Sequence, residues 1–177
     1  MIKKEYFNIE LEDLQYLAKW CAECAQRTIY IYEKIIEDDL RPRKAIEGIL
    51  EFVESGKRTN ILRKLALDAY RSSIETKNEA ACASARAASL AAASAYTHPF
   101  KDINQARHIL GPAAFSILAS ELYTTSSGIS KIEMETAICS VNNSVIQLLK
   151  KMPSQRTGKK RIDELYYQLD QKIRQLN

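Results

Sequence analysis

The chain has 177 residues, about the length of one domain, and 46% of them are hydrophobic, so it can bury a substantial core without disulfides or a metal. With only 5 Gly and 4 Pro, the composition excludes collagen-like and long disordered segments. The net charge of +4 is small, and the basic and acidic residues are interleaved along the chain, so charge alone does not indicate a nucleic-acid partner.

Three amphipathic helices are predicted in the N-terminal half. Apolar residues recur at three- and four-residue steps over residues 9–36, and Asn8 precedes this run as the expected N-cap. Pro42 suits the first turn of a second helix over residues 41–55, because its missing N–H has no intrahelical partner there. The third helix is predicted over residues 60–75.

An alanine-rich segment, residues 79–97, is predicted to be the central helix. Its small side chains on every face would let neighbouring backbones approach closely. Beyond Glu79 it carries a single charge, on Arg86, which argues against a solvated helix. We therefore expect the other helices to surround it.

The C-terminal half is predicted to hold three more helical segments. Residues 102–123 are helical in pattern, but Gly111-Pro112 predicts a kink or a split there, because proline removes a hydrogen bond and clashes with the preceding turn. A capping-box pattern opens a helix over residues 130–151. Residues 152–159 are predicted to be a polar, mobile linker, followed by a last helix over residues 160–176.

These elements predict an all-α fold: a single-domain antiparallel bundle of about seven helices, spanning residues 1–177, around the alanine-rich helix. The longest apolar stretch, residues 87–96, is about half as long as a membrane-spanning helix requires. No apolar run follows the first five residues as it would in a signal peptide. We therefore expect a cytoplasmic protein without a membrane partner.

Cysteine chemistry is the first possible function to weigh, since the chain contains Cys21, Cys24, Cys82 and Cys139. Residues 20–24 (WCAEC) look like a redox motif, but such a motif needs its first cysteine at a helix N-terminus, which lowers the thiol pKa. Here it lies within a helical pattern, so packing is the favoured role and free thiols are expected. His98 and His108 are not spaced with the cysteines as zinc ligands, and no metal or cofactor is predicted.

Charges near the second helix start form the most unusual cluster. Cations at a helix N-terminus oppose its dipole, so Arg41 and Arg43 need another reason to be there. They either pair with carboxylates of neighbouring helices or contact an acidic partner. Arg86, if buried, must also be paired. Its partner could be Glu47, Glu23 or a backbone carbonyl, and Glu47 is the expected one. A ligand contact is the alternative for Arg86.

A second charged feature is a basic stretch that contains no acid: Lys150, Lys151, Arg156, Lys159, Lys160 and Arg161. Such a patch is typical of contacts with nucleic acid or anionic lipid. It lacks the interleaved aromatic residues that would stack on bases. A solvated linker is therefore the favoured interpretation, and nucleic acid is not the favoured partner.

Residues 20–27 and the segment 40–47 (LRPRKAIE) resemble the opening of a family of bacterial immunity proteins associated with polymorphic toxin systems. The pattern continues in the alanine-rich helix, residues 80–95, and in residues 107–111, which include His108. The resemblance covers about the first two thirds of the chain. It implies an all-α fold, a cognate protein toxin as partner and no catalytic residue.

We therefore expect an immunity protein that binds and neutralises a co-encoded toxin by steric occlusion. The candidate partner- or ligand-binding residues are Arg41, Arg43, Glu47, Arg86 and His108. No phosphate-binding loop, nucleophile elbow or HExxH motif is present, so an enzyme is not predicted. Two alternatives stay open: a nucleic-acid-associated protein using residues 150–161, and a small-ligand protein or enzyme with a site near Arg41, Arg86 and His108. The oligomeric state is also open.

Overall fold

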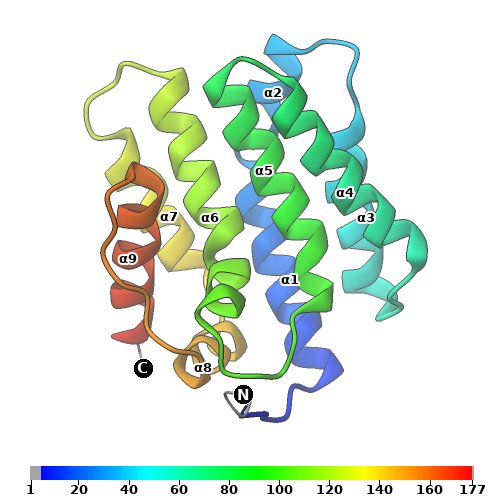
Figure 1. Ribbon diagram of the computed structural model, residues 1–177, viewed down its shortest axis with the longest axis vertical. Helices are drawn as coiled ribbons and strands as arrows, with labels where there is room; N and C mark the ends of the chain where they lie inside the picture. Colours follow the sequence, from blue (N-terminus) through cyan, green and yellow to red (C-terminus); the bar gives the residue numbers. More distant parts are fainter. Residues whose placement is uncertain (1–4, 177) are drawn as a thin grey trace.

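Helices form almost all of the regular structure between residues 5 and 176, the part of the chain that the computed structural model describes (Figure 1). The elements are α1 (Leu11–Gln26), α2 (Ile29–Ile35), α3 (Arg41–Ser55), α4 (Asn60–Glu75), α5 (Glu79–Ala93), a 3₁₀ helix (Ser94–Tyr96), α6 (Ile103–Tyr123), α7 (Ile129–Ser140), α8 (Asn143–Lys151) and α9 (Arg161–Arg174). The predicted all-α class is confirmed. The helices outnumber the seven predicted because two predicted helices are each divided in two.

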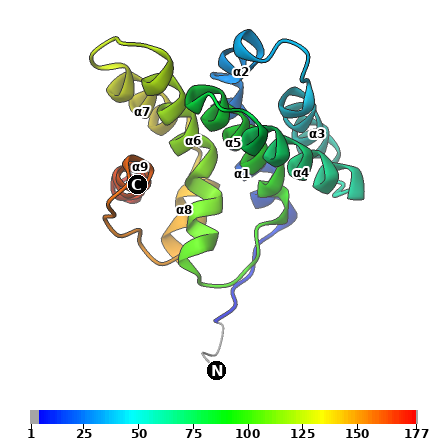
Figure 2. The same ribbon diagram turned by 45° about the horizontal axis from the view of Figure 1, so that its top comes forward.

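The alanine-rich helix α5 lies at the centre of the helical array, as predicted. It packs against α1, α2, α3, α4 and α6, and 10 of its 15 residues are buried. Figures 1 and 2 show α5 between α4 and α6, with α1 behind it. Alanine and serine side chains let these five neighbours approach a single helix.

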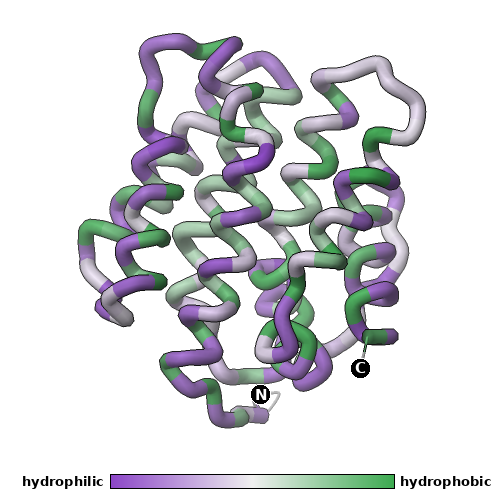
Figure 3. The backbone as a smooth tube through the Cα atoms, turned by 180° about the vertical axis from the view of Figure 1, so that it is seen from behind, coloured by the Kyte–Doolittle hydropathy of each residue, from purple (hydrophilic) through white to green (hydrophobic). Residues whose placement is uncertain are grey.

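The surrounding helices are amphipathic. Seen from behind, the chain alternates between hydrophobic and hydrophilic residues along most of its helices (Figure 3), as expected where one face of each helix meets a core. Trp20 lies within that core, and its indole Nε1 donates to the carbonyl of Ala137 at 3.0 Å. Within the described residues, no helix has the length and apolar character that crossing a membrane requires.

The helix predicted over residues 9–36 is interrupted at Arg27 and Thr28, which form a turn between α1 and α2. Thr28 is fully buried, and its carbonyl accepts a hydrogen bond of 2.8 Å from Ser84 of α5. Its hydroxyl donates to Ser116 of α6. These contacts with distant residues satisfy polar groups of the turn and favour the break, which the local pattern does not reveal.

The helix predicted over residues 130–151 is also broken, between α7 and α8. Asn142 is the N-cap of α8: its side-chain oxygen accepts from the backbone N–H of Val145 at 3.0 Å. Its side-chain nitrogen donates to the carbonyl of Tyr16 at 3.1 Å. Asparagine side chains compete with helix hydrogen bonds in this way, so Asn142 starts a new helix.

Two predicted helix starts are misplaced by a few residues. Glu10, not Asn8, is the N-cap of α1, and it makes no side-chain capping hydrogen bond. The predicted capping box at Ser130 is not used, because α7 already begins at Ile129. Gly128 precedes it with φ of +94°, a backbone conformation that glycine adopts without steric cost.

Helix α6 continues through Gly111-Pro112, so of the two predicted alternatives the split into two helices is wrong and the kink stays a prediction. Both residues are buried. A Cβ atom on Gly111 would lie 2.6 Å from Cδ1 of Leu90, which shows how closely α5 and α6 approach at this point. We attribute the continuity of α6 to this packing, which opposes the local effect of the proline.

Residues 152–159, which are predicted to be a polar, mobile linker, are mostly exposed, but Gln155 in their middle is buried and hydrogen-bonded. Gln155 is 3% exposed; its backbone N–H donates to Asp170 at 3.0 Å, and its side chain donates to the carbonyl of Ile103 at 3.1 Å. Asp170 is fully buried and pairs with Arg174 at 2.9 Å. The segment therefore ties α6 to α9, which lie side by side.

Candidate partner-binding groove

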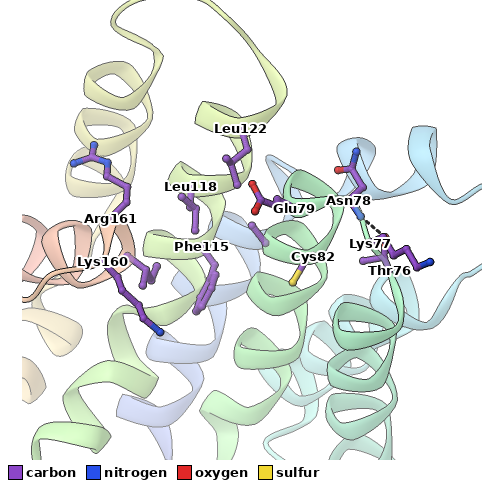
Figure 4. A pocket seen from close by; sticks show the side chains of 12 residues that line it. Thr76, Lys77, Asn78, Glu79, Cys82, Phe115, Leu118, Leu122, Lys160 and Arg161 are labelled. Carbon is purple, nitrogen blue, oxygen red and sulfur yellow. Dashed lines mark hydrogen bonds between the residues drawn. The ribbon is translucent and has the colours of Figure 1, made fainter.

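Two adjoining pockets lie along the exposed edge of α5, between α6 and the start of α9, and Figure 4 shows the one that Cys82 lines. One has a volume of about 410 Å³, and Cys82, Leu118 and Leu122 are among its lining residues. The other has a volume of about 340 Å³, and its lining includes Arg86, Leu90, Arg107, His108 and Tyr166. Because both pockets share Phe115, Lys160 and Ile162, we treat them as one groove, the α5 groove.

The sequence of α5 explains why the groove lies where it does. Glu79, Cys82, Arg86 and Leu90 recur at three- and four-residue steps and form one stripe of the helix. They are partly or fully exposed, whereas the alanine and serine residues on the other faces are buried. Larger side chains fit only on the side of α5 that its neighbours leave uncovered, and this stripe becomes the floor of the groove.

Arg86 lies between two aromatic rings. Its guanidinium carbon is 4.5 Å from the ring centroid of Tyr70 on α4 and 5.6 Å from that of Phe115 on α6. Among residues 5–176 it makes no ion pair, so the predicted pairing with Glu47 is wrong. Glu47 is exposed on α3. The aromatic faces attract the Arg86 cation instead, and its partial exposure removes the need for a buried carboxylate.

The remaining cations of the groove differ in whether a carboxylate already neutralises them. Arg107 pairs with Asp163 at 3.1 Å. Arg161 pairs with Glu121 at 2.6 Å, and Figure 4 shows it directed away from the pocket. Lys160 is exposed and makes no ion pair within the described residues. Lys77 also lines the first pocket and makes no ion pair within the described residues, but Figure 4 shows its side chain directed away from the pocket. Lys160 and Arg86 are therefore the cations facing the groove that have no carboxylate of their own within the described residues.

His108 lines the same pocket as Arg86. Partial burial of the ring, the neighbouring His98 and the charge of Arg86 together lower the pKa of His108 below its ordinary value. The ring is therefore mainly neutral at pH 7. The structure brings Arg86 and His108 together, as the small-ligand alternative requires, but Arg41 does not line this pocket.

Arg41 and Arg43 form ion pairs at the junction of α2 and α3. Arg41 binds Asp39 at 2.7 Å and Glu75 at 2.5 Å. Arg43 makes two hydrogen bonds of 2.6 Å to the carboxylate of Glu33. These contacts match the first interpretation of the two arginines, pairing with carboxylates of neighbouring helices.

Asp39 is the residue whose importance the sequence does not reveal. Its carboxylate accepts hydrogen bonds of 2.7 Å from the hydroxyls of Tyr32 and Ser72, and it also accepts from the side chain and backbone N–H of Arg41. The hydrogen bonds from Arg41 hold the pKa of Asp39 well below its usual range, against partial burial. Burial and the bond to Asp39 raise the pKa of Tyr32 to about 12. The only sequence signal is an aspartate just before a predicted helix start.

Comparison of the sequence with protein families gives a match over residues 8–138, to the family described as Imm-5 like putative immunity protein. The chain belongs to this family. No curated protein and no solved structure matches the chain. The matched region of this immunity-family protein runs from before α1 into α7, and it includes the α5 floor and the α6 wall of the groove.

The basic stretch of this immunity-family protein is divided between two places. The Nζ atom of Lys150 donates to the carbonyl of Leu176, just beyond the C-terminal end of α9, whereas Lys160 and Arg161 lie at its N-terminal end. A helix of 14 residues is about 20 Å long, so Lys150 and Lys160 lie near opposite ends of α9. Arg156 and Lys159 are exposed between these ends.

The cysteines of α1 are core residues, as the packing interpretation predicts. Cys21 and Cys24 are fully buried, and burial raises the pKa of both thiols, that of Cys24 to about 11. Thiolates are therefore disfavoured at these positions, and the WCAEC segment has neither the helix N-terminal position nor the lowered thiol pKa of a redox centre. Within residues 5–176, no three His, Cys, Asp or Glu residues are grouped so that they could hold a metal ion.

Proposed function

We propose that this protein binds a protein toxin and neutralises it by covering the toxin's active site. The observation that carries the proposal is membership of the immunity-protein family over residues 8–138. The setting that we propose is a polymorphic toxin system, in which the toxin and immunity genes are neighbours. Inhibition by occlusion needs a firm, complementary surface and no catalytic group.

The architecture supports this mechanism. Helices packed closely on α5 form a firm support, and the backbone hydrogen bonds of each helix are internal. The α5 groove adds a concave surface with exposed apolar and cationic side chains. Such a surface can bind a partner without a conformational change in the immunity protein.

The test is rescue of growth from a neighbouring toxin. Each gene adjacent to the immunity gene is expressed by induction in a host that lacks the locus, with and without this protein. We expect one neighbour to arrest growth and co-expression to restore it, with a stable complex on size-exclusion chromatography. The proposal fails if no neighbour is toxic, or if toxicity persists while this protein is present in folded form.

A further inference from the structure

We propose that the α5 groove is the surface that holds the toxin, and that it receives a toxin segment in which a carboxylate lies beside apolar side chains. This inference rests on the proposed function and adds the location and chemistry of the interface. The carboxylate would pair with Arg86 and Lys160, and the apolar side chains would pack on the α6 wall of the groove.

The first support for this proposal is that Arg86 and Lys160 have no carboxylate partner within the described residues. Arg41, Arg43, Arg107 and Arg161 already have carboxylate partners. Arg86 has aromatic rings on its faces but makes no hydrogen bond through its guanidinium within the described residues. The rings limit its movement, so the N–H groups are held at the groove ready for an acceptor. A guanidinium fork matches a carboxylate, and a charge-assisted pair is stronger than a neutral hydrogen bond.

The second support is the apolar surface around these cations. Phe115 and Leu118 are partly exposed in the groove, and Leu122 at its rim is 43% exposed. The surface continues onto α4, where Leu67 is 51%, Tyr70 40% and Ile74 63% exposed at helical spacing. Because the ring of Tyr70 contacts Arg86, this stripe adjoins the groove. Clustered exposed apolar residues mark interaction surfaces.

Size favours a protein partner over a small anion. A stable protein interface covers about 800 Å² on each partner, far more than one pocket provides. The groove and the α4 stripe together span four elements, α4, α5, α6 and the start of α9, which is beyond the reach of a single small anion. A small anion would use the cations alone and leave the apolar side chains uncovered.

The acids of the groove argue against nucleic acid. Glu79 and Asp163 are among the lining residues, and Asp163 already neutralises Arg107. A phosphate backbone requires a row of available cations, each contributing to affinity and to its salt dependence. Arg86 and Lys160, flanked by apolar residues, instead suit one carboxylate in a protein surface.

The experiment measures binding of the purified toxin, in catalytically inactive form, by isothermal titration calorimetry. The variants are Lys160→Glu and Arg86→Gln, and the matched control is Lys44→Glu, which reverses an exposed charge on α3 outside the groove. We expect Kd to rise by about 30-fold or more for each groove variant and by less than about 3-fold for the control. Thermal unfolding checks that each variant remains folded.

Compensation in the toxin provides the sharpest readout. If a toxin Asp or Glu pairs with Lys160, its replacement by Lys should restore binding to Lys160→Glu but not to the wild type. The inference fails if the folded groove variants bind as tightly as the wild type while growth rescue is intact, a result that leaves the proposed function standing. It also fails if this protein alone forms a dimer that Lys160→Glu dissociates, because a second copy would then occupy the groove. Absence of any toxin binding by the wild type would overturn the proposed function itself.

Discussion

At the α2–α3 junction, individual carboxylates offset an unfavourable placement of cations at a helix N-terminus. Arg41 and Arg43 lie where the helix dipole is unfavourable for cations, and their ion pairs with Asp39, Glu75 and Glu33 offset this. Asp39 has the largest share of these contacts because four donor groups converge on its carboxylate. These hydrogen bonds require the Asp39 carboxylate to be ionised, so the stability of this junction depends on pH.

Replacing Asp39 by Asn should destabilise the protein at pH 7 by about 2 kcal/mol, because charge-assisted hydrogen bonds become neutral ones. The folded-state pKa of Asp39 is depressed, so its contribution is complete above the unfolded-state pKa near 4 and is lost as pH falls through the lower folded value. The difference in unfolding free energy between wild type and Asp39→Asn should therefore shrink below about pH 4. Urea unfolding at a series of pH values measures it.

Asp38 supplies the matched control for this prediction. It is the exposed neighbour of Asp39, so Asp38→Asn should change stability by no more than about 0.5 kcal/mol at any of these pH values. Equal effects of the two substitutions, or parallel pH profiles for wild type and Asp39→Asn, would contradict the role assigned to Asp39.

Helix α5 shows how composition alone can place an element. Its alanines have little hydrophobic area each, so the helix contributes mainly by allowing close contact with five neighbours. The break at Thr28 shows the opposite case, because its carbonyl accepts a hydrogen bond from a residue far away in the sequence. Asn142 differs, since it starts α8 through a local cap bond to Val145 as well as a distant bond to Tyr16. A local pattern can find a central helix but not the break at Thr28.

Replacing Ala88 by Leu should destabilise the fold by about 1–3 kcal/mol, because the extra methyl groups have no space beside a fully buried position. Ala93→Leu at the partly exposed end of the same helix is the control and should cost less. The measurement is the midpoint of urea unfolding, compared between variants whose unfolding free energy depends equally steeply on urea concentration. If both variants unfold at the wild-type midpoint, α5 does not have the close packing described here.

On the scale of the whole molecule, the groove depends on where α9 lies. Phe115 and Arg86 come from α6 and α5, but Lys160 and Ile162 reach them only because residues 152–159 are anchored by Gln155 and the buried Asp170. The sequence predicts Arg86 and His108 as site residues and Lys160 as part of a basic stretch. Lys160 joins the other two only through contacts across more than 50 residues of sequence, which no local pattern reveals.

Thiol reactivity should report the integrity of this whole structure. Cys139 is exposed and should react rapidly with a thiol reagent at pH 8, while Cys82 is half-buried with a raised pKa and should react slowly. Cys21 and Cys24 should react only when the protein unfolds, since burial raises their pKa values. Reaction of all four thiols at the same rate under native conditions would contradict the buried position of α1.

The sequence by itself determined the all-α class, the central place of the alanine-rich helix, the packing role of Cys21 and Cys24, and the resemblance to immunity proteins. These follow from periodicity, composition and short motifs, which are local properties of the chain. Tertiary structure decided the partners of Arg86, the hydrogen bonds of Asp39, the anchoring of residues 152–159 and the α5 groove. The physical reason is that a side chain selects its partner by distance in space, and the local pattern does not state which faces of two helices, even of two consecutive ones, come to lie against each other.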